Sequence, residues 1–161
     1  MTKIIIRKPT TEDAFEIARD IRPADGFEIN ASSGRSPIDV ILDGVRDSTI
    51  CGVGCIRNKP IYIFGVQECT GTALSSGVAY GWLLTTTAVD DHKLAFWRSC
   101  KEWLPILLGR WAGLTNYIDN RHTKAIEWAE RLGFRLDPPK PWGLYQMPFR
   151  RFEVTMEDLN V

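Results

Sequence analysis

The side chains best suited to proton transfer in this sequence are two histidines and a tyrosine: His92, His122 and Tyr117. Imidazole titrates near neutral pH and serves as a general acid or base. The dipeptide Asp91-His92 has the form of an acid–base pair. Asp90-Asp91 also suits a helix cap followed by an exposed first-turn histidine, and we favour the cap. His122 precedes a predicted helix, where we expect a surface residue. Both histidines are therefore weak catalytic candidates, and Tyr117 is a third.

Several other chemistries are excluded by residue type and spacing. Cys51 and Cys55 fall within one predicted strand, where four residues span about 13 Å. That separation is too long for two thiolates on one zinc, whose Zn–S bonds are about 2.3 Å. Cys69 and Cys100 stand alone, so we expect free thiols and no metal site. The sequence has no Gly-x-Ser-x-Gly elbow and no phosphate-binding P-loop motif.

Composition and charge restrict the class of protein further. The chain has 161 residues, with 20 lysines and arginines against 20 aspartates and glutamates, so its net charge is zero. A nucleic-acid-binding protein usually carries a basic excess, so we expect no nucleic-acid partner. No apolar run reaches the roughly 18 residues that a membrane span requires, and the N-terminus does not resemble a signal peptide. We predict a single domain over residues 1–161 in the cytoplasm.

The elements that position these residues follow from periodicity and capping signals. We predict a strand at 4–7, a helix after the Thr10/Asp13 cap, a short helix over 27–31 and a helix begun by Ser36-Pro37. Strands follow at 49–56, 61–67 and 78–85, the last after a Gly/Ser/Thr-rich loop at 70–77. A long helix over 92–110, kinked at Pro105, precedes a stiff loop at 137–141 and a strand over 144–154.

The most informative segment runs from Leu114 to Phe134. Residues 114–118 alternate apolar and polar, as a half-buried strand does, and Asp119-Asn120 breaks the strand. Residues 124–132 have the apolar spacing of a helix, and Gly133 sits where a left-handed C-terminal cap is required. Phe134 then starts the next strand.

This order, Ala125-Ile126 followed by Leu132-Gly133-Phe134 after a strand and a polar elbow, resembles the second half of the GNAT acyltransferase fold. The resemblance implies an α+β (mixed α/β) fold, with a central mixed, mostly antiparallel sheet flanked by helices. It also implies an acyl-CoA cleft. Acetyl-CoA, if bound, would contact Leu84, Thr85, Thr86, Thr87 and Asn120.

A narrower resemblance rests on five sets of residues. They are Arg7-x-x-Thr10-x-x-Asp13, Ile21-Arg22-Pro23-Ala24-Asp25-x-x-Glu28, Phe64-Gly65-Val66 and Asn116-Tyr117-Ile118-Asp119, together with Pro148-Phe149-x-x-Phe152. Together they are similar to GNAT-like proteins of tailed bacteriophages, including the internal virion protein A group of short-tailed phages. This implies a place in the host cytoplasm or in the virion, and partners among virion or assembly proteins.

Two departures from the GNAT enzymes weaken the prediction of catalysis. Their glycine-rich turn before the long helix uses backbone N–H groups to bind the CoA pyrophosphate. Residues 84–93 here contain no glycine, and Asp90-Asp91 would repel phosphates. The helix tyrosine that protonates the departing thiolate is replaced by Ala129, although Tyr117 or Tyr145 could substitute in space.

The remaining candidates would lie at the cleft that the resemblance implies. Asp25 and Glu28 at its mouth could bind an amine acceptor, and Trp82 could lie over a pantetheine arm or an acceptor. Each also has a plain structural interpretation, as surface charge or as core.

We predict a phage-encoded GNAT-fold protein with a degenerate acetyl-CoA site that acts in virion structure, assembly or partner binding, with no cofactor expected. One alternative is an acetyl-CoA-dependent N-acetyltransferase with an atypical cofactor loop. The other is a non-catalytic module that binds a small molecule or a peptide.

Overall fold

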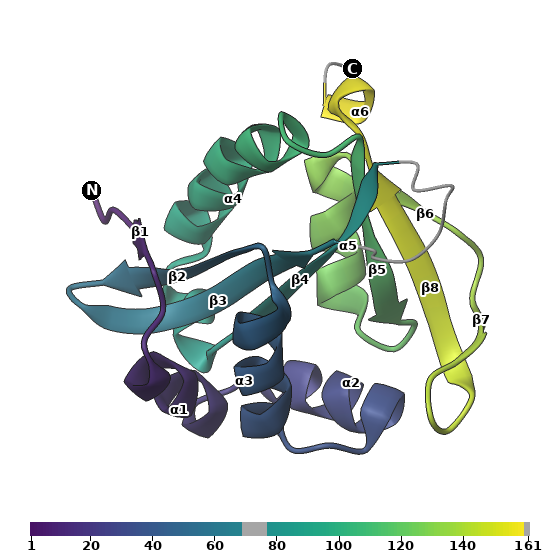
Figure 1. Ribbon diagram of the computed structural model, residues 1–161, viewed down its shortest axis with the longest axis horizontal. Helices are drawn as coiled ribbons and strands as arrows, with labels where there is room; N and C mark the ends of the chain where they lie inside the picture. Colours follow the sequence, from purple (N-terminus) through teal and green to yellow (C-terminus); the bar gives the residue numbers. More distant parts are fainter. Residues whose placement is uncertain (69–76, 160–161) are drawn as a thin grey trace.

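A computed structural model describes residues 1–68 and 77–159. The loop expected at 70–77 lies almost wholly outside these residues, as does Cys69. One mixed sheet of eight strands organises the chain, in the order β1-β2-β3-β4-β5-β8-β6, with β7 paired to β8. All neighbouring strands are antiparallel except β4 and β5, which are parallel. The fold class predicted from the sequence is therefore confirmed (Figure 1).

The first half of the chain contributes one strand, three helices and a meander. These elements are β1 (Ile5–Arg7), α1 (Thr11–Arg19), α2 (Pro23–Ser33), α3 (Pro37–Asp47), β2 (Ile50–Ile56), β3 (Lys59–Gln67) and β4 (Val78–Thr85). Thr10 and Asp13 form a reciprocal capping box, and Ser36 caps α3 through the Asp39 amide, as predicted. The helix expected over 27–31 is longer than predicted because Pro23 starts it, and Gly26 lies inside it.

The second half alternates helices and strands. It comprises the 3₁₀ turn η1 (Thr87–Asp91), α4 (Lys93–Leu108), β5 (Gly113–Asp119), α5 (Thr123–Leu132), β6 (Arg135–Leu136), β7 (Lys140–Trp142), β8 (Met147–Val154) and α6 (Met156–Leu159). Gly133 ends α5 with a left-handed φ of 102°, as the sequence predicted. The stiff loop expected at 137–141 was partly wrong, because Lys140–Trp142 pairs with β8 at the sheet edge.

Helices cover both faces of the sheet, with α1 and α3 on one side and α4 and α5 on the other (Figure 1). Alternate residues of β3 define the two cores. Tyr62, Phe64 and Val66 pack in the cluster beneath α4, whereas Ile63 packs with Ala14, Ile17 and Ile41 of α1 and α3. Alternation of side chains across a strand explains this division. The described part of the chain has no helix long and apolar enough to cross a lipid bilayer.

Candidate active site

The parallel strands β4 and β5 separate part of the way along their length. They pair only at Val78–Gly113, Ala79–Leu114 and Tyr80–Thr115, although β4 continues to Thr85 and β5 to Asp119. Asn116 marks the point of separation, where its Nδ2 donates a 2.8 Å hydrogen bond to the carbonyl oxygen of Gly81. Beyond that point the two strands form no further pairs with each other, and a gap opens in the sheet.

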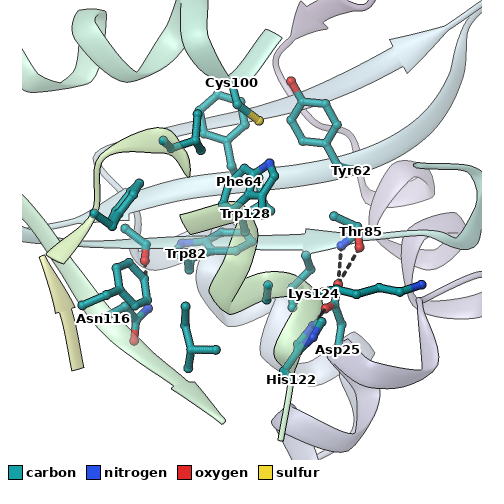
Figure 2. A pocket seen from close by; sticks show the side chains of 18 of the residues that line it. Asp25, Tyr62, Phe64, Trp82, Thr85, Cys100, Asn116, His122, Lys124 and Trp128 are labelled. Carbon is teal, nitrogen blue, oxygen red and sulfur yellow. Dashed lines mark hydrogen bonds and ion pairs between the residues drawn. The ribbon is translucent and has the colours of Figure 1, made fainter. Parts of the chain in front are cut away.

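A pocket of about 880 Å³ occupies this gap (Figure 2). A volume of this size suits a small-molecule site. Its walls come from α2, β3, β4, α4, β5 and α5, and most of the side chains are apolar. The aromatic part of the lining includes Tyr62, Phe64, Trp82, Phe96, Trp103 and Trp128.

Asp25 is the centre of a buried polar cluster on the α2 side of this pocket. One of its carboxylate oxygens accepts hydrogen bonds from the amide and the hydroxyl of Thr85, at 2.8 and 2.7 Å. The other lies 2.9 Å from Nε2 of His122. Each of the three residues is at most 8% exposed. The start of α2 is held at the end of β4 because the Arg22 amide donates to the carbonyl oxygen of Thr85.

The surface position expected for His122 was therefore wrong. Its backbone amide donates to the carbonyl oxygen of Asp119, which turns the chain inward after β5. An ionised Asp25 only accepts hydrogen bonds, so Nε2 of His122 carries the proton toward it. This arrangement leaves the lone pair of Nδ1 free to act as a base. Because Asp25 and His122 lie 97 residues apart, no local signal in the sequence joins them.

Glu28 lies one helical turn after Asp25 and also lines the pocket. Burial, followed by the charges of Asp25 and Asp119, raises the pKa of Glu28 to about 8. Burial also acts on Asp119, but hydrogen bonds from Arg121 outweigh it and lower the pKa of Asp119. With a pKa of about 8, Glu28 keeps a proton near neutral pH that it can still release.

The segment between β4 and α4 is tied to the start of α2. Thr86 forms an antiparallel bridge with Ile21, and the Thr87 amide donates to the carbonyl oxygen of Asp20. Asp90 forms an ion pair with Arg22, whose side chain is 16% exposed. The cap expected from Asp90-Asp91 was wrong, because both residues lie in η1 and His92 occupies the N-cap position without a side-chain hydrogen bond. The Asp90 carboxylate, which we expected to help cap the helix, is instead paired with Arg22.

The structure brings together some of the other predicted site residues and not all of them. Leu84, Trp82 and Tyr117 line the pocket, with Tyr117 stacked on Trp142 at 4.3 Å between ring centroids. Thr86, Thr87, Asn120 and His92 are outside its lining. Tyr145 is 58% exposed, and Ala129 is buried. Among residues 1–68 and 77–159, no group of three His, Cys, Asp or Glu side chains could hold a metal ion.

Comparison with known proteins identifies the fold. No protein-family model matches the sequence, and no curated protein is similar to it. Solved structures do match. AAC(6')-Ib in complex with ribostamycin and coenzyme A aligns with a TM-score of 0.72 at 13% identity, covering 98% of this chain and 96% of that chain.

A GNAT-family acetyltransferase from Streptococcus pneumoniae aligns at 0.61 and 14% identity, covering 94% and 98% of the two chains. YncA, a putative acetyltransferase from Salmonella typhimurium solved with acetyl-CoA, aligns at 0.66 and 10%, covering 95% and 94%. The chain therefore has the GNAT acetyltransferase fold.

The residues present fit one part of an acyl-CoA molecule better than the other. The gap between β4 and β5 is apolar, open and large enough for an acylated pantetheine arm. The loop before α4 differs from a pyrophosphate cradle, because the amides of Thr86, Thr87, Val89 and His92 already donate to protein carbonyl oxygens. The donor arm therefore has a site on this chain, whereas four amides of the loop are not free to bind a diphosphate.

Proposed function

We propose that this protein transfers an acyl group from a pantetheine thioester, such as acetyl-CoA, to the nitrogen of an amine acceptor. The observation that carries the proposal is the gap between β4 and β5, which leads to the buried Asp25–His122 pair. Two of the similar structures were solved with coenzyme A or acetyl-CoA, which supports a donor of this kind. The bound thioester supplies an electrophilic carbonyl carbon and a thiolate leaving group.

His122 is the base in this proposal. The acceptor nitrogen forms a bond to the thioester carbonyl carbon, the carbon–sulfur bond breaks, and the sulfur leaves with the bonding electron pair. Nδ1 of His122 takes the proton that the nitrogen loses, and Asp25 stabilises the imidazolium through Nε2. That proton returns through His122 or water to the thiolate, which gives an amide and a thiol. Ala129 offers no proton at the position of the usual helix tyrosine.

The acceptor is expected to be a cationic amine. Asp25, Glu28 and Asp119 are close enough for the charges of the two aspartates to raise the pKa of Glu28. A bound ammonium group relieves that repulsion because it favours the ionised form of each carboxyl group. The ammonium group first releases one proton to water. The neutral amine then attacks the thioester, and His122, beside the same carboxylate, takes the second proton.

The two other functions expected from the sequence stay predictions. A virion or assembly role rests on the sequence resemblance to phage proteins, and none of the structural comparisons supports it. A non-catalytic binding module would use the same pocket without the base. Loss of chemistry on substitution of His122 distinguishes the enzyme from such a module.

The test is thiol release from acetyl-CoA in the presence of a panel of amines, including polyamines, lysine peptides, and the aminoglycosides bound by similar structures. We expect release above background with at least one amine, and about a hundredfold slower release by a His122→Gln variant. A His92→Gln variant is the matched control, because His92 is outside the pocket lining. No release with any amine, together with no calorimetric binding of the donor, would refute the proposal.

A further inference from the structure

We infer that the donor site recognises the acylated pantetheine arm and does not bind the nucleotide end of coenzyme A. The inference rests on the proposed function, since it concerns the donor of that reaction. It follows from the hydrogen bonds that the amides of the loop before α4 already make, and from the Nε1–H group of Trp128, a pocket residue, which has no hydrogen-bond partner among the described residues.

Four amides of the loop donate to carbonyl oxygens of the protein. The Thr86 amide donates to the carbonyl oxygen of Ile61 at 2.9 Å, and the Thr87 amide to that of Asp20 at 3.2 Å. Those of Val89 and His92 donate to carbonyl oxygens of Thr86 and Val89. A backbone cradle binds phosphate through N–H groups that have no other partner. Binding a diphosphate here would require these hydrogen bonds to break.

The loop is also attached to α2 along its length. The bridge between Ile21 and Thr86 fixes its start, and the ion pair between Arg22 and Asp90 fixes the 3₁₀ turn. Residues 84–93 include no glycine, so side chains stand where a diphosphate would approach the backbone. Opening the loop would separate α2 from the end of β4, and α2 carries Asp25. The loop therefore helps to hold Asp25, which we place at the acceptor site, in position.

Trp128 provides the second observation. Its Nε1 is the buried side-chain nitrogen or oxygen atom that lacks a hydrogen-bond partner within residues 1–68 and 77–159. The indole lines the pocket, as Figure 2 shows, and stacks on Phe96 at 5.6 Å between ring centroids. A buried N–H without a partner costs about 1–3 kcal/mol. In this structure Nε1 is closed to solvent, so the indole must rotate slightly to bring its N–H to the pocket surface. A pantetheine arm contains two amide carbonyl groups, and either can then accept this hydrogen bond.

The same chemical arm occurs in coenzyme A and on acyl carrier proteins, where it is attached through one phosphate. Lys93 and Lys124 line the pocket, and both are close enough to Asp90 to help lower its pKa, after Arg22. Two lysines can neutralise a single phosphate without a backbone cradle. Coenzyme A and an acyl carrier protein both carry a phosphate next to the pantetheine arm, so the two lysines could serve either source.

Calorimetric titration of the full chain tests the inference with three small ligands: S-acetylpantetheine, acetyl-CoA and adenosine 3′,5′-diphosphate. We expect the first two to bind with dissociation constants within about fivefold of each other, and the nucleotide not to bind at about 1 mM. Acetyl-CoA binding about 100-fold more tightly than S-acetylpantetheine would overturn the inference and leave the proposed function intact. No binding of either thioester would overturn both.

A fourth titration, with an acetylated acyl carrier protein, distinguishes the sources. Tighter binding than that of S-acetylpantetheine identifies a carrier protein as the donor, and equal or weaker binding identifies coenzyme A. Either result agrees with recognition of the arm when the three small ligands behave as expected.

A pair of matched variants tests the role of Trp128. Trp128→Phe removes the N–H and keeps an aromatic ring, so it should weaken S-acetylpantetheine binding about fivefold. Trp111→Phe is the control, because that indole donates to Glu68 and is outside the pocket lining. Circular dichroism checks that both variants fold. Unchanged affinity in a folded Trp128→Phe variant would contradict the assignment of this hydrogen bond.

Discussion

The unusual ionisation of Glu28 leads to a prediction about stability. In the folded protein the pKa of Glu28 is about 8, against an ordinary value of 4.5. Between these two values the folded state holds a proton that the unfolded chain has released. Stability therefore falls as pH rises through this window, and the effect of Glu28 disappears below pH 4.5, where both states are protonated.

The size of the effect follows from the shift in pKa. Each pKa unit corresponds to about 1.4 kcal/mol, so the full shift sets an upper limit of about 5 kcal/mol above pH 8. Glu28 is half-buried, so solvent screening reduces this figure and we expect about 2 kcal/mol. Glu28→Gln keeps the shape and stays neutral. The variant should exceed the native chain in stability by this amount at about pH 9, and match it at about pH 4.5.

Urea unfolding followed by circular dichroism at both pH values measures the difference. Glu130→Gln, on an exposed position of α5, controls for the loss of one negative charge. Equal midpoints for the native chain and Glu28→Gln at both pH values would refute the reasoning, because a carboxyl group that ionises normally creates no such difference.

Three further predictions concern the pocket residues Asp25 and Glu28, and two glycines, one inside α2 and one at the end of α5. Asp25→Ala leaves the Thr85 amide and hydroxyl without their hydrogen-bond partner, so it should lower the free energy of unfolding by about 3 kcal/mol. Urea titration measures this loss. A loss below about 1 kcal/mol would contradict the stabilising role of these buried hydrogen bonds. Gly133→Ala should destabilise the protein by about 1 kcal/mol, because φ is 102° and the new Cβ would lie 3.1 Å from the Asp158 carbonyl oxygen. Gly26→Ala inside α2, where the nearest contact of the new Cβ is at 3.8 Å, should stabilise it by about 0.5 kcal/mol. Thermal unfolding that ranks the two variants in the reverse order would contradict this. Putrescine binding at pH 7 should release up to about one proton from Glu28, seen as a dependence of the calorimetric heat on the ionisation enthalpy of the buffer; a heat that is the same in all buffers would place the ammonium elsewhere.

Local signals in the sequence were sufficient for most of the secondary structure. Thr10 with Asp13, Ser36 with Asp39, and Gly133 each act within a few residues of their own position, so a reader of the sequence can find them. The strand at Lys140–Trp142 was missed because Pro138, Pro139 and Pro141 together indicate a loop. A proline is tolerated in an edge strand, and Pro141 pairs with Pro148 at such an edge.

The candidate site depends on contacts that no local pattern contains. The sequence indicated Asp25, Glu28 and Trp82 as a group, and the structure places all three on one pocket. It did not join His122 to Asp25, because the end of β4, the start of α2 and the turn after β5 meet only in the folded chain. It also treated Asp90 as a repulsive charge, whereas Arg22 pairs with it across 68 residues.

The most direct test of the account is calorimetric titration of acetyl-CoA into the native chain and into a Gly81→Phe variant. Gly81 lies where β4 and β5 separate, and a Cβ at this position meets only Leu114 side-chain atoms at ordinary contact distances, so a larger side chain should enter the gap and leave the strands paired. We predict binding by the native chain with a dissociation constant between about 1 µM and 1 mM, and at least about tenfold weaker binding by the folded variant. Equal affinity in the two proteins, or no binding by the native chain, would contradict the claim that this gap is the donor site.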